Sequence, residues 1–394
     1  MMKKLLSPVL VLCFPILLHA QLIVGGLVDV EFRKGQLDSS PVLNQTPNDK
    51  LNIYTPYIRL FGLGVISDQW FAEMGLQADY YQGDALSPVF FSLININWLP
   101  LSDSEFMISA GRFVTPYGSQ SERVLSSENP FVHLPLSHVW NLGVDRKTGI
   151  FFDEPDYEND ALYGQSMIYQ RMYSQGIKFS NKTAQQKLFY EFAVTMAAAS
   201  SYLEVGSHNK PAFMGRMTYQ PAIWARLGSS FSYGPYMIRD PLNSHISSAD
   251  LQSYNQLLYG ADVTVSHLYY SFSIEANISQ WTSPDYAYED ILINEPLAVA
   301  AHYSAEMNVQ FPFLAGAYTA VRGEILRPGE IRQRGQSTSY NNYYPLGPKV
   351  DRAEFVVGYR LNPTVRTKAS YLIHAISPDQ TRANVLTMQL SVGF

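Results

Sequence analysis

Charged side chains recur at every second position near the C-terminal end of the chain. Glu354 and Arg360 alternate with Phe355 and Tyr359, and Arg366 and Lys368 follow the same rule in the next segment. A period of two places the charged and apolar sets on opposite faces of a β-strand. Charges on one face can line a water-filled lumen, where acidic or basic rings favour cations or anions. This spacing therefore predicts ion-selectivity chemistry.

The same parity assigns a mixed set of acids, bases and amides to the inner face of the strands. Their mixture predicts a transverse field across a wet lumen with at most a mild preference for cations, although plain wetting of the wall is the alternative for any one of them. Arg112 can either line a constriction or pair with a carboxylate as a structural tie. The set assigned by parity is Asp29, Glu31, Arg33, Glu73, Gln77, Asp79, Glu191, Asp262, Glu275, Glu306, Arg322, Glu324, Glu354, Arg360, Arg366 and Lys368. The pore-lining candidates are Arg112, Glu122, Arg123, Glu128, Glu73, Asp79, Arg322, Glu324, Glu354, Arg360, Arg366 and Lys368.

Other chemistries find weaker support in the residues. His133 and His138 lie five positions apart without a convincing third ligand for zinc. The acidic run 153–160 does not match the spacing of a calcium-binding EF-hand loop, so a solvated loop is favoured. Ser304 and Ser370 lie near His302 and His374 in sequence, but no G-x-S-x-G elbow accompanies them. We therefore expect neither a catalytic site nor a metal or other cofactor.

Composition narrows the class of protein. Only 16% of the 394 residues are charged, against about 25% in ordinary soluble domains. Aromatic residues make up 13%, with 27 Tyr and 21 Phe, while the mean hydropathy is −0.09. These values suit a barrel that shows lipid only every second residue. The net charge of −6 argues against a nucleic-acid partner, which requires a clustered basic face.

Residues 1–20 have the pattern of a secretory signal peptide. Lys3 and Lys4 precede an apolar run from Leu5 to Leu18, and cleavage is expected after Ala20. Removal would change the net charge from −6 to −8 and would also remove Cys13, the one cysteine. A membrane anchor is the alternative, but this run is too short for a comfortable helical span. Lipidation at Cys13 is a further, minor alternative.

Residues 21–394 alternate in a way that predicts an all-β, 16-stranded antiparallel transmembrane barrel. Many of the segments have 10–14 residues, and short and long connections alternate between them, as in membrane barrels. The expected strands are 22–34, 51–66, 70–81, 88–99, 105–114, 174–181, 187–198, 211–219, 223–234, 255–265, 268–280, 297–310, 314–327, 351–361, 365–376 and 382–394. A further hairpin near 149–152 would give 18 strands. The apolar content of the long segment 115–173 indicates that it folds into the lumen; an outer cap is the alternative.

Two segments and the C-terminus resemble a known family. Ile108 to Gly118 (ISAGRFVTPYG), the hairpin 173–194 and the terminal LSVGF are similar to Gram-negative outer-membrane porins, closest to the phosphate-selective-porin-like superfamily with its Bacteroidota members. The resemblance implies that Leu390, Val392 and Phe394 form a signal for the barrel-assembly machinery. The many acids of segment 115–173 depart from the basic pore of phosphate-selective relatives, so phosphate selectivity is not carried over.

These features together predict an outer-membrane porin that passes small hydrophilic solutes or ions. Its expected partners are outer-membrane lipid, the assembly machinery and those solutes, and many porins of this size are homotrimers. A surface adhesin or ligand-binding barrel acting through its outer loops is the alternative, favoured if the long segment plugs the lumen. An outer-membrane barrel hydrolase is a weaker one.

Overall fold

The computed structural model describes residues 21–35, 51–79, 89–101, 104–150, 164–183, 187–201, 210–240, 243, 246–288, 291–329, 331–333, 346–377 and 381–394. These residues are nearly all in strands and their connections. The expected signal peptide, the acidic run 153–160 and the side chain of Asp79 lie outside the described part. None of the helices in the described part is long and apolar enough to cross a membrane.

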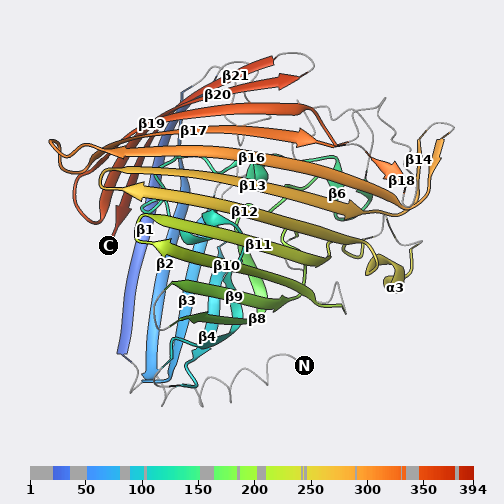
Figure 1. The fold of residues 1–394 in the computed structure, drawn as a ribbon, viewed down its shortest axis with the longest axis horizontal. Coiled ribbons are helices and arrows are strands. Elements are labelled where there is room, and N and C mark those ends of the chain that lie inside the picture. Colours follow the sequence, from blue (N-terminus) through green and yellow to red (C-terminus); the bar gives the residue numbers. More distant parts are fainter. Residues whose placement is uncertain are drawn as a thin grey trace.

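Sixteen antiparallel strands of the described chain form one closed barrel (Figure 1). Each strand pairs with its neighbours along the chain, and β1 pairs with both β2 and β21. Backbone hydrogen bonds between Gly26 and Phe394, at 2.9 and 3.0 Å, complete the closure. The barrel strands are β1 (Gln21–Gly35), β2 (Leu51–Ser67), β3 (Trp70–Asp79), β4 (Phe90–Trp98), β5 (Met107–Val114), β8 (Tyr173–Lys182), β9 (Leu188–Thr195), β10 (Ala212–Ala222), β11 (Ala225–Pro235), β12 (Asn255–His267), β13 (Tyr270–Thr282), β16 (Pro296–Gln310), β17 (Ala317–Pro328), β19 (Lys349–Arg360), β20 (Val365–Ser377) and β21 (Thr381–Gly393).

The sixteen-stranded prediction is confirmed, and the extra hairpin near residue 149 does not enter the barrel. β6 (Val144–Asp145) pairs only with β7 (Gly149–Ile150), in a separate two-stranded sheet. β18 (Arg332–Gln333) adds a short edge to β16, and β14 (Tyr286–Tyr288) pairs with β15 (Ile291–Ile293) in a hairpin beyond the wall. These short strands prolong the connections between barrel strands.

The two ends of the barrel differ in their connections. One, which we call the turn end, carries the short turns 68–69, 223–224, 268–269, 311–316 and 361–364. The opposite, loop end carries the long connections, among them 115–172 and 236–254, the latter with helix α3 (Ser248–Leu251). This asymmetry agrees with the short and long connections expected from the sequence.

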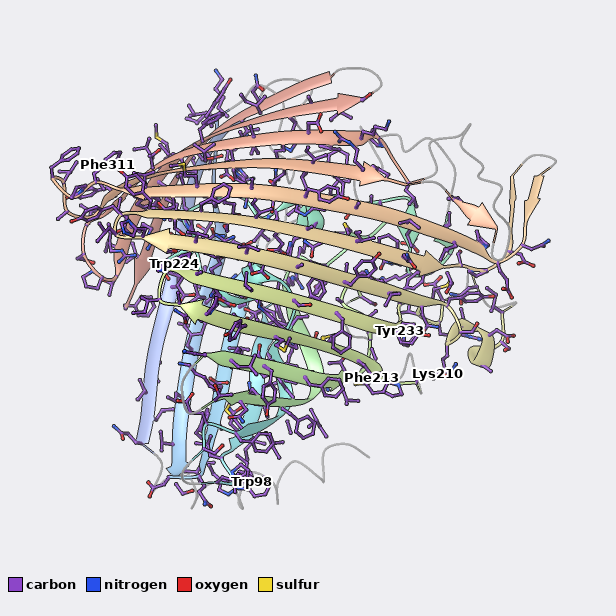
Figure 2. All side chains as sticks on the ribbon, in the orientation of Figure 1. Trp98, Lys210, Phe213, Trp224, Tyr233 and Phe311 are labelled. Atoms are coloured by element: carbon purple, nitrogen blue, oxygen red, sulfur yellow. The ribbon has the colours of Figure 1, made fainter. Side chains whose placement is uncertain are left out.

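The outer face of the barrel is apolar. Every second side chain of each strand points outward, and many of these side chains are large and hydrophobic. Ile274, Val357 and Met388 are examples of the exposed large hydrophobic residues on this face. Aromatic residues lie toward both ends: Figure 2 shows Trp224 near the turns and Tyr233 toward the loop end. An apolar band flanked by aromatic girdles is the pattern of barrels that lie in lipid.

The inner face is polar near the turn end and apolar near the loop end. The long connection between β5 and β8 lies inside the closed sheet, where Figure 1 shows its teal and green trace between the strands of opposite walls. We call residues 115–150 and 164–172 the inner loop. Its short helix α2 (Leu136–Val139) packs against β17.

Two glycines direct the chain from β5 into the inner loop. Gly111 has a φ of 129°, and a Cβ there would lie 2.2 Å from the carbonyl oxygen of Ile94 on the adjacent strand β4. Gly118 has a φ of 69°, in the left-handed region that favours glycine. A side chain at either position would be strained, so the glycines of the 108–118 motif serve the backbone path.

Candidate pore constriction

The first part of the inner loop binds the wall formed by β11 and β13. The Tyr117 hydroxyl donates to Asn277 Oδ1 at 3.0 Å, and the Gly118 N–H donates to Ser230 Oγ at 3.0 Å. The hydroxyl and the N–H of Ser119 both donate to the Glu275 carboxylate, the N–H at 3.2 Å. Burial raises the pKa of the Tyr117 phenol well above its usual value, so this hydroxyl keeps its proton. A polar strip of the wall therefore fixes residues 117–119.

Glu122 joins the inner loop to two basic residues of the wall. Its carboxylate lies 3.1 Å from Arg216 Nη2 and also contacts Arg226. Arg216 pairs in turn with Asp262 at 2.6 Å, and both of these side chains are buried. The next loop residue, Arg123, forms an ion pair with Glu306 of β16 at 2.5 Å.

Glu354, on β19, accepts several hydrogen bonds from the centre of the inner loop. Its Oε1 accepts the backbone N–H groups of Val132 at 3.1 Å and His133 at 3.2 Å, and it lies 3.0 Å from Nδ1 of His133. The Ser370 hydroxyl donates to the same oxygen at 2.9 Å, and Arg322 Nη2 donates to Oε2 at 2.6 Å. The Glu354 side chain is fully buried. This wall carboxylate is thus the main anchor of residues 132–133.

Glu324, on β17, anchors the following residues in the same manner. Its Oε1 accepts the N–H of Leu136, the first residue of α2, at 2.8 Å and lies 3.1 Å from Nε2 of His302. Its Oε2 pairs with Arg322 at 3.1 Å and with Arg352. Arg352 also donates to the Leu134 carbonyl at 2.5 Å. Together, Glu324 and Glu354 hold residues 132–136, and we call them the carboxylate clamp.

The two histidines of the inner loop are buried. Burial lowers the pKa of His138 to about 3, and burial outweighs the attraction of Glu354 to lower the pKa of His133 as well. Both imidazoles are therefore neutral at pH 7. No group of three or more metal-ligating side chains is found in the described part of the chain. The His133 ring contacts Glu354 and the His138 ring contacts Ser137, so both take part in the packing of the inner loop.

One set of contacts resembles a catalytic triad, with Thr387 in the place of the nucleophile, His133 of the base and Glu354 of the acid. Thr387 Oγ1 lies 3.4 Å from Nε2 of His133, whose Nδ1 faces Glu354. Thr387 and Glu354 are both 0% exposed, however. A substrate would not reach this hydroxyl, so the arrangement serves to anchor the inner loop.

Three cationic side chains bind carbonyls of loop segment 124–131. Arg59 Nη1 donates to Val124 O at 3.1 Å, and Arg366 Nη1 donates to Asn129 O at 3.2 Å. Lys368 Nζ donates to the carbonyls of Ser126 at 2.8 Å and Phe131 at 3.1 Å. The Ser126 hydroxyl also donates to Asp29 at 2.7 Å. Segment 124–131 is therefore tied to β1, β2 and β20, on the side opposite β11 and β13.

The loop end of the lumen is filled by an apolar cluster. The inner loop contributes Leu136, Trp140, Leu142, Val144, Ile150, Met167 and Ile168. The inward faces of the strands contribute Leu258, Trp281, Ala298, Ala300, Leu326, Val350, Leu372 and Val385. Burial of these side chains stabilises the loop through the hydrophobic effect. The polar ring of anchors therefore lies between this cluster and the turn end.

A cavity remains on one side of the inner loop. Its volume is about 30 Å³, and it lies between wall residues of β2, β3 and β21 and the loop segments 124–134 and 170–172. The wall contributes Tyr57, Arg59, Gln77 and Gln389. Contacts with β10, β11, β13, β16, β17, β19 and β20 hold the loop elsewhere around the lumen. This off-centre cavity is therefore the candidate narrow point of a path through the barrel.

Known structures share this architecture at very low sequence identity. The structure is similar to that of an anion-selective porin from Comamonas acidovorans (TM-score 0.61, 8% identity, covering 95% of this chain and 100% of the other). It is also similar to the outer membrane channel DcaP of Acinetobacter baumannii (0.56, 9%, 95% and 97%) and to the outer membrane protein OmpT of Vibrio cholerae in its trimer form (0.55, 7%, 95% and 99%). The fold is that of a porin. No protein-family model and no curated protein matches the sequence.

The porin-like barrel gathers many of the sequence-predicted site residues at the inner loop. Glu122, Arg123, Arg322, Glu324, Glu354, Arg366 and Lys368 belong to the ring of anchors described above. Glu128 is exposed on the loop. Partial burial raises the pKa of its carboxyl group, and the nearby Arg366 and Arg59 act in the opposite direction, to lower it.

The remaining predicted site residues lie away from this ring. Glu73 lies 3.4 Å from Asn97, and Arg360 is exposed at the end of β19. Arg112 stands opposite the outward residue Ile94, with its guanidinium 5.5 Å from the Phe90 ring. The backbone of Asp79 ends β3, but its side chain is outside the described part.

Several important residues were missed by the sequence reasoning. Arg352 has the same parity as Glu354, so the alternation that selected Glu354 also pointed to it. Arg59 and Arg216 likewise sit at inward positions of β2 and β10. The hydroxyl and backbone groups of the loop carried no such signal, because their partners on the wall lie far away in sequence, 65 residues for Val124 and Arg59 and 242 for Ser126 and Lys368.

Proposed function

We propose that this protein is an outer-membrane porin, a passive diffusion channel for small hydrophilic solutes or ions, in which residues 115–173 form the constriction. The observation that carries the proposal is a closed barrel whose inner loop is bound to both walls and leaves a cavity beside it. The apolar outer face and the similarity to porins and outer-membrane channels support it. Passive diffusion follows the solute gradient and requires no cofactor.

The same proposal sets the location and partners of the chain. The apolar band and its aromatic ends would face outer-membrane lipid. Residues 1–20 would be a signal peptide, cleaved after Ala20. Leu390, Val392 and Phe394 would be read by the barrel-assembly machinery. Their strand closes the barrel against β1, so its pairing completes assembly.

Family and oligomeric state belong to the proposal as well. The 108–118 motif supports membership of the phosphate-selective-porin-like superfamily, among its Bacteroidota-type members. A homotrimer is supported by the trimeric form of the Vibrio cholerae protein with the same fold. Outward apolar residues would form the interface between protomers.

One observation favours a second function. The apolar cluster fills the loop end of the lumen, as expected for a barrel that acts through its outer loops as an adhesin or ligand-binding protein. Single-channel recording of the purified mature protein in a planar bilayer separates the two. Discrete, stable conductance steps support the porin, whereas a correctly folded barrel that inserts without conducting supports the second function.

A further inference from the structure

Three neighbouring turns at the turn end expose large apolar side chains at their tips. Ile223 is 95% exposed, Leu268 82% and Phe313 84%. Their hairpins lie side by side in the wall, because β11 pairs with β12 and β13 pairs with β16. A single exposed apolar residue is ordinary, whereas a contiguous group marks an interaction surface. We call this group the apolar rim; it comprises residues 223–224, 268–269 and 311–316.

Backbone hydrogen bonds join the three turns of the apolar rim. The N–H of Ser266 donates to the Trp224 carbonyl at 2.8 Å, and the N–H of Gln310 donates to the Tyr269 carbonyl at 2.8 Å. Figure 2 shows Trp224 and Phe311 at the same end of the barrel. The apolar rim is therefore one continuous surface, held in place by the wall.

The apolar rim differs in charge from the rest of the turn end. Residues 219–225, 266–271 and 309–317 include no Asp, Glu, Lys or Arg, and His267 is the one basic residue among them. The other short connections at this end expose a charged or amide side chain, namely Asp68, Glu105, Lys187 and Asn362. Turns that project into water are rich in polar residues. This one-sided composition therefore indicates that the apolar rim is covered.

The apolar rim continues the apolar outer face of the barrel. On β13 the outward residues from Ile278 to Tyr270 are apolar, and the next outward residue toward the loop end is Gln280. This stretch covers about 21 Å of barrel height, at a rise of about 3.4 Å per residue and a tilt of about 40°. The apolar band of membrane barrels is about 25 Å tall. The turn at Leu268 adds about 5 Å and so completes a band of that height.

The residue types of the apolar rim favour lipid as its occupant over a protein. Trp and Tyr, here Trp224 and Tyr269, concentrate where a bilayer meets water. A typical protein interface carries about ten hydrogen bonds, whereas the side chains of Ile223, Leu268 and Phe313 can form none. The backbone of a turn cannot lie in hydrocarbon without hydrogen-bond partners. The fitting level is therefore the boundary between acyl chains and headgroups.

We propose that the apolar rim is a lipid anchor, in which Ile223, Leu268 and Phe313 insert among phospholipid acyl chains at the periplasmic boundary of the membrane. The polar turns with Asp68 and Asn362 stay in water. The side of the barrel from β10 to β17 then reaches deeper into this leaflet than the side with the polar turns. The proposal rests on the location in the outer membrane that belongs to the proposed function.

The test introduces one cysteine at a time into the barrel, which contains none from residue 21 onward. Leu268→Cys and Phe313→Cys probe the apolar rim, Asp68→Cys is the matched control in a polar turn, and Ile274→Cys marks the apolar wall. Each variant is labelled with a fluorophore and reconstituted into phosphatidylcholine vesicles. Quenching is measured with iodide on both sides of the bilayer and, separately, with a nitroxide-bearing phospholipid. Labels at the rim and at Ile274 should be quenched by the nitroxide lipid and should lose most of the iodide quenching seen at Asp68.

The outcomes separate the anchor from the location on which it rests. Rim labels that iodide quenches as strongly as the Asp68 label, beside a protected Ile274 label, would overturn the anchor and leave the transmembrane barrel intact. Rim labels shielded from both quenchers would show that a protein, such as a second copy of this chain, covers the rim, which also overturns the anchor. An Ile274 label open to iodide would overturn the membrane location as well. Ile223→Cys replaces either rim variant if heat-modifiable mobility shows that it has not folded.

Discussion

Removing the charge of Glu354 should release the inner loop and widen the channel. In Glu354→Gln, the side chain keeps an oxygen that accepts hydrogen bonds but loses its charge. Three loop donors, the N–H groups of Val132 and His133 and the imidazole of His133, then bind a neutral acceptor. Arg322 is left with a weaker partner in a fully buried position.

The size of the effect follows from these contacts. Hydrogen bonds to charged groups contribute about 1.5–3 kcal/mol and neutral ones about 0.5–1.5 kcal/mol, so three weakened bonds cost about 3–4 kcal/mol. Breaking a buried ion pair by removing one charge costs a similar ~3–5 kcal/mol. A loss of about 4 kcal/mol raises the equilibrium population of the released loop about a thousandfold.

Single-channel recording measures this population directly. Glu354→Gln should show frequent transitions to conductance levels above that of the wild type. Asp351→Asn is the matched control, because Asp351 lies on the same strand but pairs with Arg327 on the outer face. Conductance levels and dwell times of Glu354→Gln that match those of wild type and Asp351→Asn would refute the carboxylate clamp as the anchor of the loop.

Three further predictions address the loop, the assembly and the export of the protein. Because burial lowers the pKa of His138 from 6.5 to about 3, the anchored loop binds fewer protons than a released loop between these values. Its anchoring is complete above pH 6.5 and weakens as the pH falls toward 3, so larger conductance levels should become more frequent at pH 4 than at pH 7.5. Phe394→Ala should reduce the yield of heat-modifiable, folded barrel in the outer membrane, whereas Phe313→Ala, which alters another exposed aromatic residue, should not. N-terminal sequencing of the exported protein should begin at Gln21, and an intact Met1 would contradict cleavage after Ala20.

The strands could be predicted well because alternation and burial act within each strand. Trp70 to Tyr80 alternates apolar and polar residues, and the structure forms β3 from Trp70 to Asp79. The closing strand ends at Gly393, within one residue of the expected end. The even number of strands follows from the same local patterns, because each long connection and each short turn reverses the chain.

The partners inside the lumen could not be predicted in this way. The parity of β19 placed Glu354 inside, but nothing local showed that it would bind backbone N–H groups more than 200 residues away. Leu326 and Trp281 could not be explained from the sequence either, because apolar residues that face inward are not expected on a water-filled inner wall. Their inward position makes sense in the structure because the inner loop covers them.

The inner loop also explains why the wall of the lumen carries so many buried charged side chains. A loop that crosses a wet barrel must satisfy its own backbone groups. Here wall carboxylates accept its N–H groups, while Arg59, Arg366, Lys368 and Arg352 donate to its carbonyls. Glu122, Glu324 and Glu354 also pair with arginines, so the same carboxylates hold the loop and neutralise guanidinium groups of the wall.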